Sequence, residues 1–157
     1  MTDDIQLRDV LPDDLPIFYE QQRDPAAAQM AAFPMREREP FMAHWAKILC
    51  NDQGLKQTIL AGGQVAGNIV CYDQDDKREV GYWLGREYWG RGVATRALEL
   101  LLEQVPDRPL HAHVAKHNRG SIRVLEKCGF VLVGEDISPA NEHGDAVEEW
   151  IMCLAAD

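Results

Sequence analysis

The segment that most constrains the fold is a turn with two glycines that opens an amphipathic helix. Gly90 and Gly92 lie in residues 88–95, where a backbone without a Cβ can turn tightly and approach a ligand closely. Behind the turn, apolar residues recur with helical spacing at Ala94, Ala97, Leu98, Leu101, Leu102 and Val105. The first N–H groups of a helix are unpaired and lie at the positive end of its dipole, so the turn can hold an anion. By itself, the turn fits a plain strand-to-helix connection equally well.

Length and composition predict one domain spanning residues 1–157. The chain is 46% hydrophobic and 27% charged, which is ordinary for a soluble protein with one hydrophobic core. No apolar run approaches the roughly 20 residues of a membrane span. The acidic first residues lack the basic and apolar regions of a signal peptide. We therefore expect a cytoplasmic protein without a membrane partner.

Charge and cysteine content narrow the partners further. A net charge of −10 argues against nucleic acid, because phosphate contacts need a basic face. The same charge favours cationic substrates such as amines. The four cysteines at positions 50, 71, 128 and 153 show no C-x-x-C spacing and lie among apolar residues, so we expect reduced, buried packing residues.

The apolar patterns also give the order of the elements. Strands are expected at residues 5–8, 56–61, 65–72, 77–84, 110–115, 130–133 and 147–154. Helices are expected from residue 12 to about 51, interrupted near Pro25, Pro34 and Pro40, then after the glycine turn and at 118–128. The pair Gly62-Gly63 predicts a hairpin between the second and third strands. Helices, an antiparallel meander and then alternating strands and helices indicate a mixed-sheet α/β domain.

A second informative segment is Asn118-x-x-Ser121 at the start of the later helix. Asn118 is well placed to cap that helix, with Ser121 in its first turn, and capping alone would explain both residues. Both this helix and the one at Gly92 follow parallel-type crossovers. Ligands in such sheets bind at the strand ends that the two helices share. The combination therefore favours a binding site.

Three segments together resemble the GNAT N-acetyltransferase superfamily. They are EVGYWL at 79–84, YWGRGVAT at 88–95, and Asn118-x-x-Ser121 running into EKCGF at 126–130. More narrowly, the chain is similar to the branch that acetylates N-terminal residues of ribosomal proteins, which Leu7-Arg8 and Asp13-Asp14-Leu15 also fit. The resemblance covers essentially the whole chain. It implies a mostly antiparallel central sheet of about six to seven strands with a splayed parallel pair, flanked by about four helices.

The resemblance also implies an acetyl-coenzyme A site. The pyrophosphate signature R/Q-x-x-G-x-G/A of the superfamily falls on Trp89-x-x-Gly92-x-Ala94, with Trp89 where Arg or Gln is usual. The pantetheine arm would lie between the splayed strands and pair with main chain near residues 82–84. The residues predicted to bind the cofactor are Tyr82, Trp83, Leu84, Trp89, Gly90, Arg91, Gly92, Val93, Ala94, Thr95, Asn118 and Ser121.

Amide formation sets the remaining requirements. An amine must lose a proton before it attacks a thioester, and Glu79 is the predicted base, although a solvated charge in the DDKRE run 75–79 is the alternative. A main-chain N–H near Trp83 or Leu84 is the predicted oxyanion donor. Ser121 is predicted to lie near the departing thiolate. The tyrosine that many relatives carry seven residues after the asparagine is Leu125 here.

Several alternatives stay open. Glu142 and His143, before the last strand, are other titratable groups that a substrate could reach. His111 and His113 share a strand face near His117, but no third ligand completes a metal site, so no metal is expected. An enzyme that acetylates a small-molecule amine or a peptide N-terminus is the main hypothesis. A non-catalytic acyl-coenzyme A sensor or regulatory module is the alternative. The sequence fits a monomer or a homodimer.

Overall fold

A computed structural model describes residues 4–31, 37–51, 54–74, 76–138 and 147–155. Its strands are β1 Ile5–Asp9, β2 Leu55–Ala61, β3 Gln64–Gln74, β4 Lys77–Leu84, β5 Leu110–Ala115, β6 Val131–Ser138 and β7 Val147–Leu154. Its α-helices are α1 Leu15–Gln22, α2 Pro25–Ala31, α3 Arg38–Cys50, α4 Val93–Gln104 and α5 Arg119–Lys127. Short 3-10 turns precede α1 and α4, at Pro12–Asp14 and Arg86–Tyr88.

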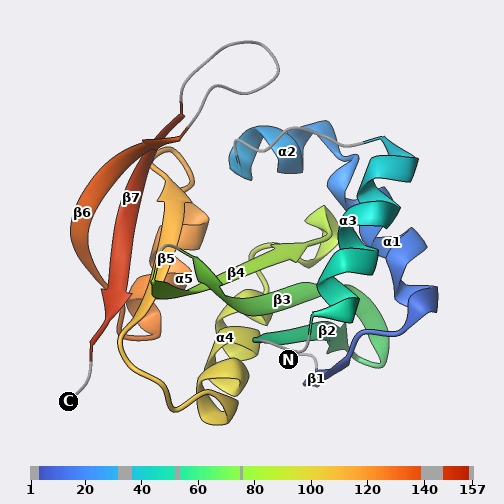
Figure 1. The fold of residues 1–157 in the computed structure, drawn as a ribbon, viewed down its shortest axis with the longest axis horizontal. Helices are drawn as coiled ribbons and strands as arrows, with labels where there is room; N and C mark the ends of the chain where they lie inside the picture. Colours follow the sequence, from blue (N-terminus) through green and yellow to red (C-terminus); the bar gives the residue numbers. More distant parts are fainter. Residues whose placement is uncertain (1–3, 32–36, 52–53, 75, 139–146, 156–157) are drawn as a thin grey trace.

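All seven strands form one sheet that divides into two halves. The strand order is β1-β2-β3-β4-β5-β7-β6, and every pair of neighbours is antiparallel except β4 and β5. Among the described residues, β4 and β5 share one register pair, Glu79 with His111. Figure 1 shows the two strands separating beyond this point, with β5, β6 and β7 curving away from β3 and β4. The mixed sheet with a splayed parallel pair confirms the expected fold class.

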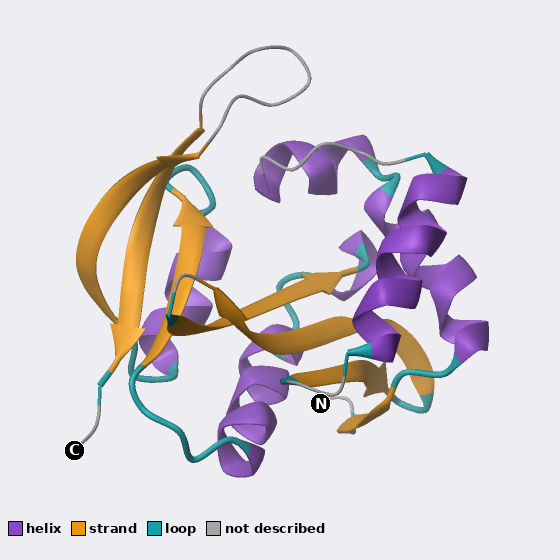
Figure 2. Ribbon diagram, viewed as in Figure 1, coloured by secondary structure: helices purple, strands orange, loops and turns teal. Residues whose placement is uncertain are grey.

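The two faces of the sheet carry different layers of helices, as Figure 2 shows. Helices α4 and α5 pack on one face, where Val80, Leu98 and Leu110 belong to the main core. Helices α1 and α3 cover the other face of β3 through a second aromatic cluster of Phe18, Tyr19, Phe41 and Trp45. Side chains alternate along a strand, so neighbouring residues of β4 contact different layers.

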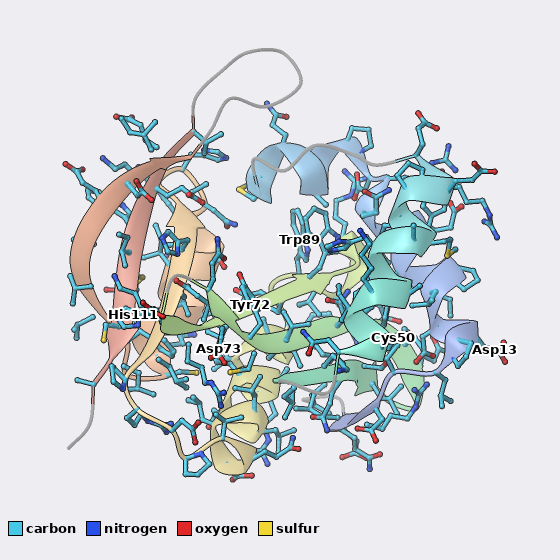
Figure 3. All side chains as sticks on the ribbon, viewed as in Figure 1. Asp13, Cys50, Tyr72, Asp73, Trp89 and His111 are labelled. Atoms are coloured by element: carbon cyan, nitrogen blue, oxygen red, sulfur yellow. The ribbon has the colours of Figure 1, made fainter. Side chains whose placement is uncertain are left out.

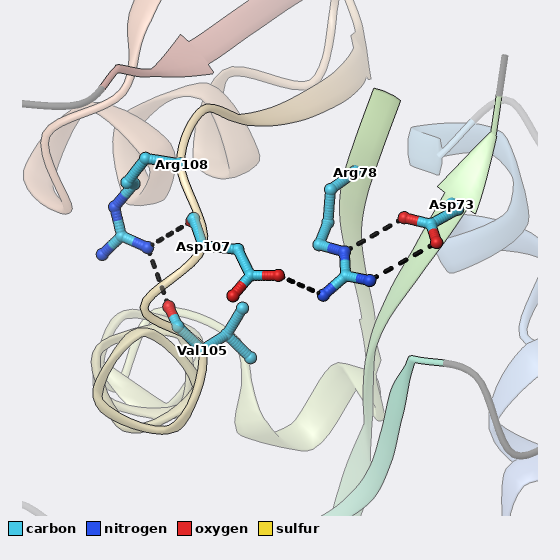
Figure 4. A network of polar contacts seen from close by, with 5 residues as sticks. All are labelled: Asp73, Arg78, Val105, Asp107 and Arg108. Atoms are coloured by element: carbon cyan, nitrogen blue, oxygen red, sulfur yellow. Dashed lines mark hydrogen bonds and ion pairs between the residues drawn. The ribbon is translucent and has the colours of Figure 1, made fainter. Parts of the chain in front are cut away.

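A polar network holds β4 and β5 together at the end where they still pair (Figure 4). Arg78 is at the start of β4, and its Nε lies 3.0 Å from Asp73 Oδ1 at the end of β3. Its Nη1 lies 2.6 Å from Oδ2 of Asp107, in the connection between α4 and β5. Arg108 donates to the carbonyl of Val105 in the same connection. The network therefore joins the end of β3, the start of β4 and the connection that leads into β5, beside Glu79.

An ion pair anchors the first helices to the sheet. Arg8 of β1 donates from Nη1 and Nη2 to the carboxylate of Asp14, at 2.7 and 2.9 Å. Asp14 also accepts from the Leu11 N–H and from the Thr58 hydroxyl of β2. Burial alone would raise the pKa of Asp14, but these bonds outweigh it and lower the pKa to about 2. The start of α1 is thus fixed to β1 and β2.

The structure corrects several details of the predicted elements. The described residues contain five α-helices, in line with the expectation of about four. Pro40, expected to interrupt a helix, instead lies in the first turn of α3, where a missing N–H costs little. Strand β6 continues to Ser138 because it pairs along β7. Cys50 is exposed and Cys128 is half-buried, so only Cys71 and Cys153 are the buried cysteines expected. Pro34 lies outside the described residues.

Candidate functional site

A cavity of about 580 Å³ lies where the ends of β4 and β5 meet the starts of α4 and α5. It contains most of the residues predicted to bind a cofactor: Tyr82, Trp83, Leu84, Trp89, Gly90, Gly92, Val93, Ala94, Thr95, Asn118 and Ser121. Figure 3 shows Trp89 near one end of β4, whereas His111 and Asp73 lie near the other. The cavity is therefore at the open end of the split between the strands.

The glycine turn has the conformation that an anion cradle requires. Gly90 and Gly92 have φ angles of +71° and +77°, which side chains rarely permit, and Gly92 is the N-cap of α4. A Cβ built on either glycine would meet no described atom within 4 Å. The main chain of this turn is therefore open to a ligand at a helix N-terminus.

The cavity is basic although the whole chain is acidic. Arg119, Arg123 and Lys127 line it, and no carboxylate does so among the residues that the structure describes. These three cations lie at i, i+4 and i+8 on α5, so they share one face of that helix. The sequence reasoning did not single them out, although this spacing could have indicated them. Arg119 adds positive charge at the N-terminus of α5, whereas Arg123 and Lys127 extend the positive charge along the cavity wall to the end of that helix.

Asn118 and Ser121 meet at the start of α5. The Oδ1 of Asn118 accepts from the Ser121 N–H at 3.2 Å, so Asn118 is indeed the helix cap. The Ser121 hydroxyl lies 2.6 Å from the phenol oxygen of Tyr82 on β4. Burial raises the pKa of Tyr82 to about 12, although the bond to Ser121 opposes the shift. Leu125, at the position of the usual tyrosine, is buried in the core at 3% exposure.

Tyr82 and Trp83 point to opposite faces of β4, as alternation requires, and both contact the cavity. Tyr82 packs against the core under α5, whereas the Trp83 indole N–H donates to the Gln21 carbonyl of α1. The Trp89 indole N–H bonds the carbonyl of Leu84 at 3.3 Å. Trp89, in place of the usual Arg or Gln, therefore closes the β4–α4 turn.

Glu79 lies away from the cavity, at the closed end of the split. Its side chain is 3% exposed, which excludes the alternative of a solvated charge. The Nδ1 of His113 on β5 lies 3.1 Å from both of its carboxylate oxygens. Sequence reasoning noted His113 only as a weak metal candidate and missed this pairing, since the two residues are 34 positions apart.

Three other predicted site residues are not placed in the cavity. Arg91 does not line it, and its guanidinium donates to the Glu87 carbonyl and lies over the Tyr88 ring. Glu142 and His143 lie outside the described residues. Over the described parts of the chain, no group of three or more His, Cys, Asp or Glu could hold a metal ion. Within those parts, no helix has the length and apolar character needed to cross a membrane.

Comparison with known proteins identifies the family. Residues 4–131 match the family described as "Acetyltransferase (GNAT) domain". The chain therefore belongs to the GNAT acetyltransferase family.

The similar proteins agree with this family. The chain is 28% identical over 105 residues to the Bacillus subtilis protein called "Putative ribosomal N-acetyltransferase YdaF". The matched region covers 62% of this chain and 57% of that protein. The matched region thus spans little more than half of that relative.

Solved structures show the same fold at lower sequence identity. A Vibrio cholerae spermidine N-acetyltransferase in complex with CoA and spermine has a TM-score of 0.79 at 17% identity, covering 96% of this chain and 95% of that one. The microcin C7 self-immunity acetyltransferase MccE, in complex with acetyl-CoA and AMP, has a TM-score of 0.81 at 18% identity. That match covers 98% of this chain and 93% of that one.

Proposed function

We propose that the protein is a single-domain N-acetyltransferase that moves an acetyl group from acetyl-CoA to a primary amine. The observation that carries the proposal is the cavity of about 580 Å³, built from two helix N-termini and lined by three cations. A diphosphate ester with a long, amide-containing arm fits this arrangement, because its phosphates need the basic turn and its arm needs free strand edges. Family membership supports the same substrate.

The turn at Gly92 would hold the pyrophosphate on main-chain N–H groups, with Arg123 and Lys127 adding positive charge at the cavity wall. The edges of β4 and β5 separate beyond Glu79, so their main chain can pair with the amides of the pantetheine arm. Asn118 would keep its Oδ1 on the helix and offer its amide N–H to the ligand. The residues present therefore fit the cofactor that the family implies.

Acetyl transfer by direct attack forms one C–N bond and breaks one C–S bond. The attacking amine must give up a proton, and we assign general-base assistance to Glu79. At 3% exposure, this carboxylate would assist through a neighbouring group rather than meet the amine directly. A main-chain N–H near Trp83 or Leu84 would stabilise the developing oxyanion.

Ser121 is the proposed donor to the departing thiolate. The phenol is the better donor and the aliphatic hydroxyl the better acceptor, so Tyr82 would donate to Ser121 and leave the Ser121 O–H directed into the cavity. This arrangement supplies a hydroxyl at the site where Leu125 cannot. Tyr82 would thus position the serine proton.

The acceptor we propose is a cationic amine, either a small molecule or a peptide N-terminus. The face of the sheet that carries Glu79 also presents Asp136 and Glu149, which pair with each other across β6 and β7. Carboxylates attract an ammonium group before it loses its proton. The spermidine acetyltransferase and the relative named for ribosomal proteins represent these two acceptor classes.

A non-catalytic acyl-CoA sensor is the second candidate, and the buried Leu125 is the observation that favours it. The two functions are separated by measuring thiol release from acetyl-CoA with spermidine, other amines and a set of peptides with free N-termini. Coenzyme A binding is measured in parallel by calorimetry. Amine-dependent thiol release supports the enzyme, whereas binding without turnover on any acceptor supports the sensor. Absence of binding would reject both.

A further inference from the structure

Glu79 and His113 form a pair in which only the histidine can meet a substrate directly. The Glu79 carboxylate is 3% exposed, whereas the His113 side chain is 33% exposed. Both oxygens of Glu79 lie 3.1 Å from His113 Nδ1. When Nδ1 donates its proton to this carboxylate, Nε2 keeps its lone pair. Nε2 lies 3.9 Å from Asp136 Oδ2, too far for a hydrogen bond.

The strand register places His113 nearer to the cavity than Glu79. Strands β4 and β5 are parallel, and Glu79 is level with His111. His113 is two residues further along β5, toward the end at which the two strands separate and the cavity lies. A proton that leaves an amine at the cavity end meets the imidazole first.

Gly81 leaves room for the amine beside this imidazole. A Cβ built on Gly81 would point to the face of β4 shared by Glu79 and Trp83. It would meet a single atom within 4 Å, the Cγ2 of Val70 at 3.8 Å. On this face of β4, Gly81 lies between Glu79 and Trp83, and His113 contacts Glu79 from the next strand.

We propose that His113 is a catalytic residue that takes the proton of an acceptor amine lying over Gly81, while Glu79 orients and stabilises the imidazole. This inference rests on the proposed acetyl transfer. The amine N–H proton moves to Nε2 as the C–N bond forms. The thiolate released when the C–S bond breaks takes the hydroxyl proton of Ser121, and solvent returns a proton to Ser121. The imidazolium then loses its proton to solvent through its exposed edge.

The electrostatic surroundings of His113 favour this role. The His113 ring lies within 4 Å of Glu79 from β4 and Asp136 from β6. The register and side-chain alternation place the other titratable groups on the same sheet face: Lys77 from β4, His111 from β5, Glu149 from β7 and Tyr72 from β3. Burial raises the pKa of Tyr72, and Glu79 and Glu149 raise it further, so the phenol stays neutral. The carboxylates of Glu79 and Asp136 therefore flank the imidazole and stabilise the cation that it becomes.

The kinetic test is the pH dependence of kcat/KM for the amine in His113→Gln, Glu79→Gln and His111→Gln. For His113→Gln, we expect a loss of about 100-fold near neutral pH that shrinks as pH rises, because free amine replaces the missing base. The pH profile of Glu79→Gln should keep the ionisation of His113 on its acidic limb. The midpoint of that limb should be displaced, because a neutral amide cannot stabilise the imidazolium. His111→Gln, on the same face but further from the cavity, should keep the shape of the wild-type profile. An acidic limb retained in His113→Gln but lost in Glu79→Gln would overturn the proposal.

A second measurement does not depend on turnover. Nitrogen-15 NMR of the histidine rings, with His113 assigned by its loss in His113→Gln, should show a proton on Nδ1 that depends on Glu79. A proton on Nε2 instead would overturn the inference, whatever the activity. A wild-type protein that acetylates no amine, yet shows the Nδ1 proton, would reject the proposed function while leaving the pairing of Glu79 and His113 established.

Discussion

The two ends of the split between β4 and β5 are built in opposite ways. At the open end, the cavity is formed by main chain at Gly90 and Gly92 and by exposed cations on α5. At the closed end, a buried carboxylate meets a histidine from the neighbouring strand, and the Arg78 network holds the surrounding segments. The open end presents main-chain N–H groups at a helix N-terminus, so our proposal for it does not depend on one particular side chain. The closed end depends on two side chains placed by the register.

From this difference we expect the open end to determine the affinity for coenzyme A and the closed end to determine the rate of acetyl transfer. Substitutions at the open end should change affinity for coenzyme A, whereas substitutions at Glu79 or His113 should change the rate and its pH dependence. Tyr82 and Ser121 combine the features of the two ends. Both line the cavity, and their side chains also form a hydrogen-bonded pair.

The largest effect is expected from Gly92→Glu. A carboxylate at the helix N-cap would occupy the open cradle and repel phosphates, so we expect coenzyme A to bind on the order of 100-fold more weakly. Calorimetry measures the dissociation constant. The matched control is Gly63→Glu in the β2–β3 hairpin, where φ is +84° and a Cβ also meets no described atom within 4 Å. Equal binding by the two variants would remove the pyrophosphate assignment.

A smaller effect is expected from removing the hydroxyl of Ser121. For Ser121→Ala, kcat with acetyl-CoA should fall by about 10- to 100-fold with little change in the dissociation constant of coenzyme A. Ser121→Thr keeps a hydroxyl and should recover part of the rate. Tyr82→Phe removes one hydrogen bond and should lower kcat by about 3- to 10-fold. If kcat is intact in Ser121→Ala, the thiolate is protonated by another group.

Asp14→Asn tests the anchor of α1 rather than the split. The pKa of Asp14 is about 2 in the folded state, below the ordinary 3.8, so its ionised form stabilises the fold. This stabilisation, about 2 kcal/mol, is complete above about pH 4 and is lost as pH falls toward 2. Urea unfolding at several pH values should show Asp14→Asn less stable at pH 7, with a gap that narrows below pH 4. Asp13→Asn, at an exposed neighbour, is the control, and a constant gap would contradict the assignment.

The smallest effect is expected from single cations at the cavity wall. Arg123→Gln and Lys127→Gln should each raise KM for acetyl-CoA by about threefold, because exposed charges are strongly screened. The increase should shrink at high salt. Arg96→Gln, an exposed cation on α4 outside the cavity lining, is the control. An increase as large in Arg96→Gln would mean that net charge, rather than position, matters.

The open end could be predicted from the sequence because its geometry is local. Glycines at 90 and 92, the periodic helix behind them and the Asn118 cap are all encoded within a few residues of each other. The closed end could not be predicted from the sequence, because the contact between Glu79 and His113 depends on how β5 aligns with β4. Alternation placed His111 and His113 on one face. The register puts His111 level with Glu79, and only the observed side chains show that His113 contacts the carboxylate. The three-helix layer of α1, α2 and α3 was likewise expected only as a helical region.

A sheet joined through one register pair has a thermodynamic consequence for its ligand. A molecule that pairs with the free edges of β4 and β5 supplies the hydrogen bonds that the missing ladder would have made. Its binding free energy is then added to the free energy of unfolding, about 2.7 kcal/mol at a ligand concentration 100 times its dissociation constant. Amide hydrogens of β6 and β7, far from the cavity, should exchange more slowly when the ligand is bound, because it joins the two halves into one cooperative unit. Acetyl-CoA would be a substrate and also the missing strand of the sheet.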